Sequence, residues 1–592
     1  MQPGFAARYL SLDLDGADSQ ASRPQQTSSD SSSAAQIARA RAIAFRLTAA
    51  WWRALTNEYR DQPLREFFEK PQAYELGSSD LALADNLGHA AARLSADLGA
   101  YQIGIAYTKL LPQDYRARYG IYYTPPSLAN RLIDQATEAG VDWTSARILD
   151  PASGGGAFLA PVARRIIKEL HACSPRILLE NIAARLRGFE IDPFGAWLSQ
   201  VALDAILLPI SLEAKKQLPV VVSICNTLDK ISIAEFDLVI GNPPYGRTRL
   251  DSSARTAYQR SLYGHANLYG LFTDLALRYA RDNGIIAFVT PTSFLAGEYF
   301  KNLRALLAQE APPVTIDFVS VRKGVFENVL QETLLATYRR GAPAAPIKVF
   351  EVRPSLSGTL EISTVGTSRL PADPSQPWLL ARESVQAPLV SRLAKLRNRL
   401  SDWGYSVSTG PLVWNRHKDQ LVTRPGGKRF PLIWAEAVTS DGRFVWRAEK
   451  KNHAPYFEAR NGDDWLITNC PCVLVQRTTA KEQNRRLIAA ALPPQFVFRH
   501  GAVAVENHLN MVKPIGKRPP VSTEVLAKFL NSAAADRVFR CVSGSVAVSA
   551  YELEAMPLPP LDNLDDLVRL VRKGAPRDQL EAACMQIYGE HI

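Results

Sequence analysis

The chain has 592 residues, of which 46% are hydrophobic and 21% are charged, and its formal net charge is +11. This length and composition predict a soluble globular protein of roughly three or four domains. The sequence contains neither a run of about 18 uncharged apolar residues nor a leader pattern, so we expect a cytoplasmic protein without a membrane span. Six scattered cysteines argue against a disulfide framework or a metal site, and the positive charge favours a polyanionic partner.

The first 115 residues contain a polar tail and a helical region. Residues 1–35 are rich in serine and poor in large apolar side chains, which predicts disorder. Residues 36–115 carry apolar side chains at spacings of three to four, such as Ile43, Leu47 and Trp51. This spacing is typical of amphipathic helices, so we expect a helical N-terminal region with these side chains in its core.

Thr124 precedes two prolines and an amphipathic stretch that contains Leu128 and Leu132. Threonine followed by proline is a good helix start, which predicts Thr124 as an N-cap. A second interpretation stays open: its hydroxyl and the free amides of the helix N-terminus bind a carboxylate of a ligand.

A strand, a glycine-rich loop and a helix follow. Asp150 ends the strand, and the loop Asp150–Gly156 contains three consecutive glycines, which let the backbone pass close to a ligand. Asp150 is placed to accept hydrogen bonds from the polar cationic end of that ligand. The loop differs from a dinucleotide fingerprint because Leu159 replaces a glycine, and it lacks the lysine of a P-loop.

Polar residues end the next two expected strands. Glu190 lies farther beyond the glycine loop than the roughly 20 residues of a dinucleotide site. A carboxylate at this place is suited to accept both hydroxyls of one ribose, which favours a mononucleoside ligand. Asn226 follows the strand 219–224 and is expected either to face an adenine edge or to cap a turn.

The apolar run 236–241 predicts a buried parallel strand, stopped by the sequence Asn-Pro-Pro-Tyr at Asn242–Tyr245. Open α/β sheets bind ligands outside the carboxyl ends of their strands, so this loop is suited to grip a flat substrate, although such proline pairs are also common in turns. Further strands are expected at 284–289, 314–321 and 334–338. Residues 116–345 therefore predict an alternating α/β array with a doubly wound sheet.

Four motifs occur in a fixed order: Tyr-Tyr-Thr-Pro-Pro, Asp-Pro-Ala-Ser-Gly-Gly-Gly-Ala-Phe, Phe-Glu-Ile-Asp-Pro and Gly-Asn-Pro-Pro-Tyr. With this order the chain resembles the gamma-type DNA adenine-N6 methyltransferases of restriction-modification systems. The resemblance covers residues 116–345 closely and 346–560 more loosely. It implies a Rossmann-like, S-adenosylmethionine-dependent methyltransferase domain at 116–345 and a mixed α/β target-recognition domain at 346–592.

The resemblance also implies a role for each motif. The contacts to S-adenosylmethionine would come from Thr124, Asp150, Ala152, Gly154, Gly156, Glu190, Asn226 and Phe272. The target adenine would be held by Asn242, Pro243, Pro244, Tyr245 and Phe326. Asn226 stands where the family often has aspartate, a change expected to weaken the contact to the cofactor adenine without abolishing it.

The chemistry of adenine methylation explains these residue types. The lone pair of the adenine amino group is delocalised into the ring, and acceptors such as the Asn242 side-chain oxygen and the Pro243 carbonyl draw the nitrogen toward tetrahedral geometry. Because this amino group is inaccessible inside a duplex, the base has to flip out and stack on Tyr245 and Phe326. Neither a metal ion nor a covalent intermediate is required.

Residues 346–592 interleave basic and aromatic side chains, as in Trp414–Lys418, which predicts contacts to phosphates and base edges. The expected function is site-specific methylation of adenine N6 in duplex DNA, as the modification component of a restriction-modification system. The alternatives are an RNA or protein-glutamine methyltransferase and a non-catalytic DNA-binding specificity subunit. Double-stranded DNA is the expected partner, a separate cognate restriction endonuclease is a second candidate, no membrane is expected, and the chain is expected to act as a monomer.

Overall fold

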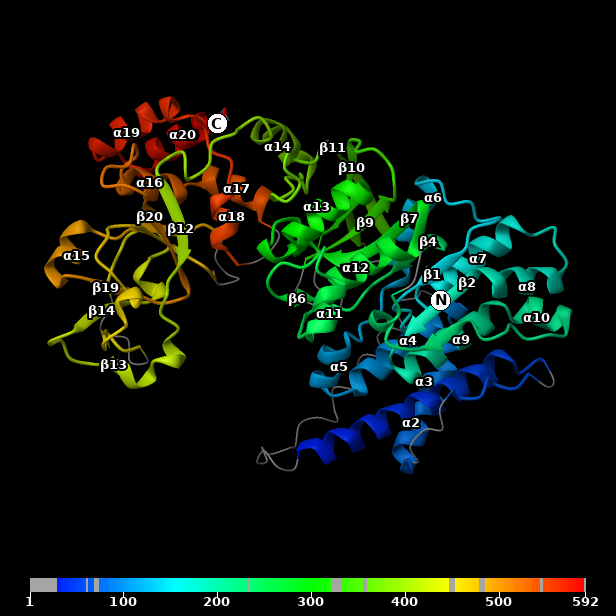
Figure 1. The fold of residues 1–592 in the computed structure, drawn as a ribbon. Coiled ribbons are helices and arrows are strands. Elements are labelled where there is room, and N and C mark those ends of the chain that lie inside the picture. Colours follow the sequence, from blue (N-terminus) through cyan, green and yellow to red (C-terminus); the bar gives the residue numbers. More distant parts are fainter. Residues whose placement is uncertain are drawn as a thin grey trace. The chain divides into compact units, whose positions relative to one another are not determined.

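The structure is a computed structural model of the 592-residue chain (Figure 1). It describes residues 29–59, 62–68, 74–231, 235–320, 332–354, 359–446, 453–478, 485–543 and 547–589. The chain divides into two compact units, Met1–Pro291 with Leu306–Thr364, and Thr292–Ala305 with Val365–Ile592.

Four helices open the described part of the first unit: α2 (Ser29–Leu55), α3 (Ser78–Ala91), α4 (Ala96–Leu110) and α5 (Gln113–Tyr119). Figure 1 shows α2 as the long dark-blue helix. Its apolar residues Ile43, Leu47 and Trp51 are buried in one cluster with Trp197 of α9 (Pro193–Ile206). The predicted helical N-terminal region is therefore confirmed. Helix α2 begins inside the tail that the sequence predicts to be disordered, and residues 1–28 lie outside the described residues.

A nine-stranded sheet forms the centre of the first unit, in the order β11-β10-β8-β9-β7-β4-β1-β2-β3. Its strands are β1 (Ile148–Asp150), β2 (Leu186–Glu190), β3 (Val222–Ile224), β4 (Phe236–Gly241), β7 (Ala280–Pro291), β8 (Pro313–Val319), β9 (Thr333–Arg339), β10 (Ile347–Pro354) and β11 (Leu360–Ser368). β1 pairs in parallel with β2 and β4, whereas β9 is antiparallel to β7 and β8. The strand order runs outward in both directions from β1 and β4, so their carboxyl ends form the switch point where such sheets bind ligands.

Helices that alternate with these strands are α6 (Pro126–Glu138), α7 (Leu159–Glu169), α8 (Pro175–Arg185), α9 (Pro193–Ile206), α10 (Leu208–Ala214), α11 (Ser252–Ala257), α12 (Leu268–Tyr279) and α13 (Lys301–Glu310). Leu238 and Ile240 of β4 share a core cluster with α6, α7 and α8. Val239 between them points to the opposite face and is also buried. The central strand is thus covered on both faces, as a parallel sheet requires, and the doubly wound prediction is confirmed.

The sheet continues past residue 345, where the sequence predicts the domain boundary. β10 pairs in parallel with β8, from Lys348 opposite Thr315 to Val352 opposite Val319. The prolines around residue 345 therefore belong to a loop between two strands of one sheet, and the division between the units follows Thr364.

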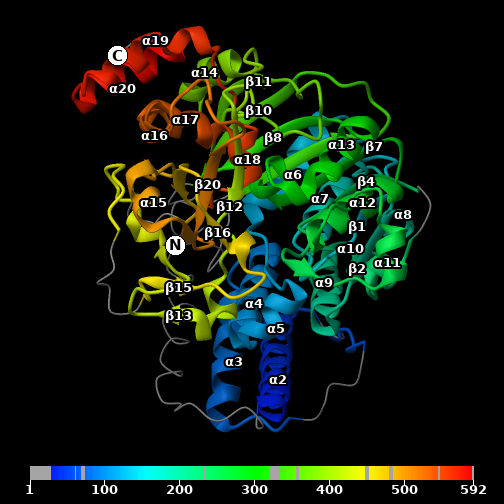
Figure 2. The same ribbon diagram turned by 60° about the vertical axis from the view of Figure 1, so that its left-hand side comes forward.

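The second unit combines two small sheets with helices. A four-stranded antiparallel sheet contains β12 (Tyr405–Thr409), β20 (Leu509–Pro514), β17 (Val473–Gln476) and β18 (Ala489–Ala491). A five-stranded sheet contains β13 (Leu421–Val422), β15 (Tyr456–Glu458), β14 (Arg429–Ile433), β19 (Val503–Val505) and β16 (Ile467–Thr468). The helices are α14 (Ala387–Leu393), α15 (Pro494–His500), α16 (Thr523–Leu530), α17 (Ala533–Val542), α18 (Ala550–Glu554), α19 (Asp565–Arg572) and α20 (Arg577–Ile587). In Figure 2, α16, α17, α19 and α20 gather at the end of this unit away from β13 and β15, and the predicted mixed α/β composition is confirmed.

Within the described ranges, no single helix is long and apolar enough to cross a membrane. The bent pair of α9 and α10 reaches the required length and composition only when both helices are taken together.

Candidate active site

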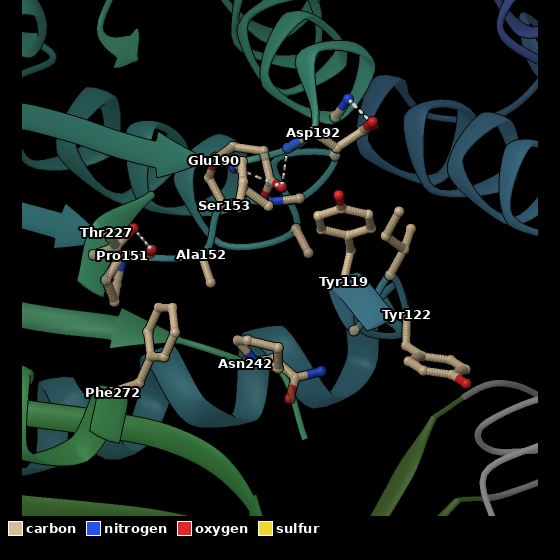
Figure 3. Close-up of a pocket in the computed structure, with 18 of the residues that line it drawn as sticks. Tyr119, Tyr122, Pro151, Ala152, Ser153, Glu190, Asp192, Thr227, Asn242 and Phe272 are labelled. Atoms are coloured by element: carbon tan, nitrogen blue, oxygen red, sulfur yellow. Dashed lines mark hydrogen bonds between the residues drawn. The ribbon is translucent and has the colours of Figure 1, made fainter. Parts of the chain in front are cut away.

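A cavity opens at the carboxyl ends of β1, β2, β3 and β4 in the first unit (Figure 3). Of the residues selected from the sequence, its lining contains Thr124, Ala152, Gly154, Glu190, Asn226, Asn242, Pro244 and Phe272. Figure 3 shows Glu190 and Ser153 on one side of the cavity, with Phe272 and Asn242 on the opposite side. Asp150, Gly156, Pro243 and Tyr245 are chain neighbours of lining residues, and Phe326 lies outside the described residues.

The glycine loop has a backbone that other residues do not tolerate. Gly154 and Gly156 have φ angles of 50° and 84°, in the left-handed region that favours glycine. A Cβ atom on Gly155 would lie 2.1 Å from Cε1 of Tyr123. The three glycines therefore form a tight cradle beside Tyr123, and at Gly154 and Gly155 the loop presents only backbone to the cavity.

The carboxyl group of Asp150 holds the start of this loop by a hydrogen bond. Its Oδ1 atom accepts a hydrogen bond of 3.0 Å from the Ala152 amide, and the residue is fully buried. Its Oδ2 atom has no hydrogen-bond partner among the residues that the structure describes. Burial, with a smaller effect from the nearby Glu190, raises the pKa of this carboxyl well above its usual value. The contact of Asp150 with the cationic end of a ligand stays a prediction.

Glu190 presents its carboxylate to the cavity while three backbone amides hold it. Oε2 accepts from Gly154 at 2.8 Å, and Oε1 accepts from Ile191 and Asp192 at 2.9 Å each. Burial is the largest effect on this group and, together with the charge of Asp192, raises the pKa of Glu190 to about 7 against the pull of the amides. Each carboxylate oxygen has two lone pairs, so Oε1 is fully used and one acceptor site remains on Oε2 for a hydroxyl group of a ligand.

Asn226 caps a turn, one of the two interpretations that its sequence left open. Its Oδ1 atom accepts from the Leu228 amide at 3.3 Å, and its Nδ2 atom donates to Asp229 at 2.9 Å. The next residue, Thr227, donates its hydroxyl to the Pro151 carbonyl at 2.7 Å. The loops after β1 and β3 are therefore joined, and the Asn226 side chain also lines the cavity.

Asn242 is held between two hydroxyl groups. Its Nδ2 atom donates to Oγ1 of Thr124 at 3.0 Å, and its Oδ1 atom accepts from the Tyr245 hydroxyl at 2.7 Å. The two contacts fix the amide at both ends, directly after β4. The Tyr245 ring packs edge-to-face on Tyr269 with centroids 6.0 Å apart, and burial raises the pKa of its hydroxyl above the usual value.

The predicted N-cap role of Thr124 is wrong. Helix α6 begins at Pro126 and has Pro125 as its N-cap, with φ −56° and ψ 137°. A residue before proline is forced out of the helical conformation, so the double proline moves the cap one residue beyond Thr124. Thr124 is 3% exposed and its hydroxyl serves Asn242 instead.

The segment before α6 contributes to the cavity in a way that the motifs did not predict. Tyr119, Gly120, Ile121, Tyr122 and Tyr123 all belong to the lining. A Cβ atom on Gly120, whose φ is 64°, would lie 2.3 Å from Cβ of Pro244. The sequence signals this contribution only by the density of tyrosines before Thr124, two of which belong to the Tyr-Tyr-Thr-Pro-Pro motif.

Among the residues that the structure describes, no group of three or more His, Cys, Asp or Glu side chains is arranged to hold a metal ion.

Comparisons with known proteins bear on this site. Residues 213–326 match the family model of the Eco57I restriction-modification methylase. Over 484 residues the chain is 26% identical to the Type II methyltransferase M.BsuBI of Bacillus subtilis, covering 77% of this chain and 90% of that protein. It is 29% identical over 353 residues to the Type II methyltransferase M.PstI of Providencia stuartii, covering 57% and 68%.

The chain is similar to the methyltransferases of restriction-modification systems. The resemblance found in the order of the motifs is therefore confirmed. A solved structure of the Type IIL restriction-modification enzyme MmeI in complex with DNA has a TM-score of 0.54 to this chain at 13% identity, covering 93% of this chain and 87% of that one. This likeness concerns the fold, and the predicted methyltransferase fold with its helical N-terminal region is confirmed.

Proposed function

We propose that this chain methylates N6 of an adenine in duplex DNA with S-adenosylmethionine, as the modification enzyme of a restriction-modification system. The observation that carries the proposal is the Asn242 amide, held by Thr124 and Tyr245 at the cavity edge. The Type II methyltransferase relatives support methyl transfer in such a system, and the DNA complex of MmeI supports a DNA substrate. A separate cognate restriction endonuclease and a monomeric state stay predictions.

The cavity residues fit S-adenosylmethionine. Glu190 offers one free acceptor position, on Oε2, for a ribose hydroxyl, Asn226 offers an amide to an adenine edge, and the Phe272 ring offers an apolar face. The backbone of the glycine loop leaves room for the methionine part. When bound, S-adenosylmethionine supplies an activated methyl group.

Asn242 and Pro243 would act on the target amino group. Tyr245 uses one lone pair of the Asn242 oxygen, so a second lone pair is free to accept an amino hydrogen. The Pro243 carbonyl, fixed by the proline ring of the next residue, would accept the other. Because both acceptors are oriented before the base arrives, they raise electron density on the amino nitrogen without reorganisation in the transition state.

The adenine has to leave the helix to reach these acceptors. Extruding a base costs a few kcal/mol, and we assign part of the compensation to stacking on Tyr245 and on Phe326. Basic residues of 346–592 would hold the flanking duplex.

The test is expression in a host that lacks adenine methylation, followed by mapping of modified bases in its genomic DNA. We expect N6-methyladenine at one short sequence, and no modification with Asn242→Ala, which should still bind DNA. Methylation by Asn242→Ala would refute the role of Asn242. Unmodified DNA in cells that contain soluble, S-adenosylmethionine-binding protein would redirect the search to an RNA or protein substrate, or to a missing partner subunit.

A further inference from the structure

Asp192, two residues beyond Glu190, accepts hydrogen bonds from three side chains of the N-terminal helical region. Arg41 of α2 donates an Nη2 hydrogen bond to Oδ1 at 2.9 Å. Tyr107 of α4 donates its hydroxyl to Oδ2 at 3.1 Å, and Tyr115 of α5 lies 3.4 Å from Oδ1. Asp192 also accepts from the Gly195 amide at 2.9 Å as the N-cap of α9. One carboxylate thus joins four helices at the edge of the cavity.

The pair of Arg41 and Asp192 is unlike an ordinary surface ion pair. The Asp192 side chain is 2% exposed, whereas the Arg41 side chain is 29% exposed. A buried carboxylate is expensive unless a cation and hydrogen bonds compensate it. Arg41 provides that cation, and the two tyrosines and the Gly195 amide fill the remaining acceptor positions.

The charge of Asp192 acts directly on Glu190. Oε1 of Glu190 accepts from the Asp192 amide at 2.9 Å, so the two carboxylates belong to one turn. The titratable groups that face Glu190 are the Asp192 carboxylate on the same turn, the Asp150 carboxyl from β1, the Tyr123 hydroxyl before α6 and the Cys225 thiol after β3. Each of these four groups is neutral when protonated and negative when deprotonated. Whenever one of them is negative, it disfavours the ionised form of Glu190.

We propose that Arg41 is a positioning residue for the cofactor: it neutralises Asp192 and thereby keeps the Glu190 carboxylate ionised to accept a ribose hydroxyl. This inference rests on the proposed S-adenosylmethionine site. It gives the helical region a task, because Arg41, Tyr107 and Tyr115 come from three of its helices. Without Arg41, two like charges would share one turn, and Glu190 would hold a proton at a higher pH.

The test is the affinity of the full chain for S-adenosylmethionine, measured by titration calorimetry between pH 5.5 and 9. Wild-type binding should weaken below about pH 7, where Glu190 takes up a proton. Arg41→Gln should move this midpoint up by roughly one pH unit, which means about fivefold weaker binding at pH 7 and near wild-type binding at pH 9. Arg41→Lys, which keeps the charge, should restore most of the wild-type profile.

Helix α2 offers a matched control. Arg39 makes a two-bond pair with Asp80, at 2.9 and 2.7 Å, away from the cavity lining. Arg39→Gln should keep the wild-type pH profile. Asp192→Asn should lower the midpoint while keeping an N-cap, since asparagine caps as well as aspartate. The double variant Arg41→Gln/Asp192→Asn removes both charges and should not show the upward shift.

The outcomes separate an electrostatic role of Arg41, a purely structural role of Arg41 and failure of the proposed cofactor. Equal weakening by Arg41→Gln at every pH would show a structural role and overturn the inference, as would an unchanged profile. If Arg41→Gln fails to fold, Asp192→Asn and the double variant decide, and a double variant with the upward shift would overturn the inference. Failure of wild-type protein to bind S-adenosylmethionine at any pH would overturn the proposed cofactor itself.

Discussion

The hydroxyl of Tyr245 orients the amide that we assign to the target adenine, through its 2.7 Å hydrogen bond to Asn242. Tyr245→Phe keeps the ring for stacking and removes only this donor. We expect the methylation rate constant to fall roughly tenfold or more, since removing a preorganised group in an active site typically costs about 10²–10³ when it contacts the reacting atoms directly. Single-turnover methyl transfer measures this effect.

Thr124→Val provides the complementary variant, because it removes the acceptor at the other end of the same amide. It should lower the rate in the same direction with little change in DNA affinity. A wild-type rate for both variants would contradict the orientation that we assign to Asn242.

Glu190 makes the stability of the cofactor-free protein depend on pH. Burial raises its pKa from the ordinary 4.5 to about 7. Between these values the folded protein binds the proton that the unfolded chain has released, so stability falls as the pH rises from about 4.5 to 7. Glu190→Gln should therefore gain thermal stability relative to wild type as the pH rises, while it loses affinity for S-adenosylmethionine. Thermal scans of both proteins from pH 5 to 8 test this, and a difference in Tm that stays constant across that range would contradict it.

At the scale of elements, the segment between α5 and α6 packs against the Asn-Pro-Pro-Tyr loop at Gly120. Gly120→Ala introduces both a strained φ of 64° and a Cβ atom 2.3 Å from Cβ of Pro244. We expect a loss of stability together with a large loss of activity, because Pro244 has to move. Gly341→Ala is the control, since its φ is 72° but no other atom of the described chain lies within 4 Å of the new Cβ.

The control should lose only the roughly 1–2 kcal/mol of a left-handed alanine and keep its activity. Chemical denaturation and methylation assays distinguish the two variants. Equal effects of both substitutions would mean that the contact with Pro244 does not matter.

The strand-end residues could be predicted because the carboxyl ends of parallel strands lie at the same edge of a sheet, so polar residues that follow separate strands come close together. Asp150, Glu190, Asn226 and Asn242 each follow an apolar run, and the switch-point rule gathers such positions at one edge. The predicted N-cap at Thr124 failed because the second proline also restricts the residue before it. The strands β10 and β11 were missed because the prolines near residue 345 indicate a loop but do not tell whether the chain returns to the same sheet.

The network around Asp192 was beyond local sequence analysis for a different reason. Arg41 and Asp192 are 151 residues apart, and no spacing along the chain relates them. Arg41 lies on a helix with several other arginines, of which Arg39 and Arg46 pair with aspartates of α3 instead. Only the packing of α2 beside α9 distinguishes the arginine that reaches Asp192.

At the scale of the whole molecule, the net charge of +11 matters for DNA affinity only where cations are free to replace counterions. In the second unit, Arg416 and Lys418 are exposed, and Lys418 lies 5.6 Å from the centroid of the Trp414 ring. Arg443 is also exposed, but it pairs with Asp441 at 2.6 Å. A cation that already pairs with a carboxylate contributes less to phosphate binding, because it has to give up that partner first.

The double variant Arg416→Ala/Lys418→Ala should therefore reduce the slope of log affinity against log salt concentration by roughly 2, close to 0.9 for each lost phosphate contact. Arg443→Ala should change the slope by clearly less than one contact. Fluorescence anisotropy with target DNA at several salt concentrations measures both slopes. If the double variant and Arg443→Ala lower the slope equally for each removed charge, DNA affinity depends on overall charge alone, and the assignment is wrong. If the slope falls only in the double variant, the segment at 414–418 contacts the DNA backbone.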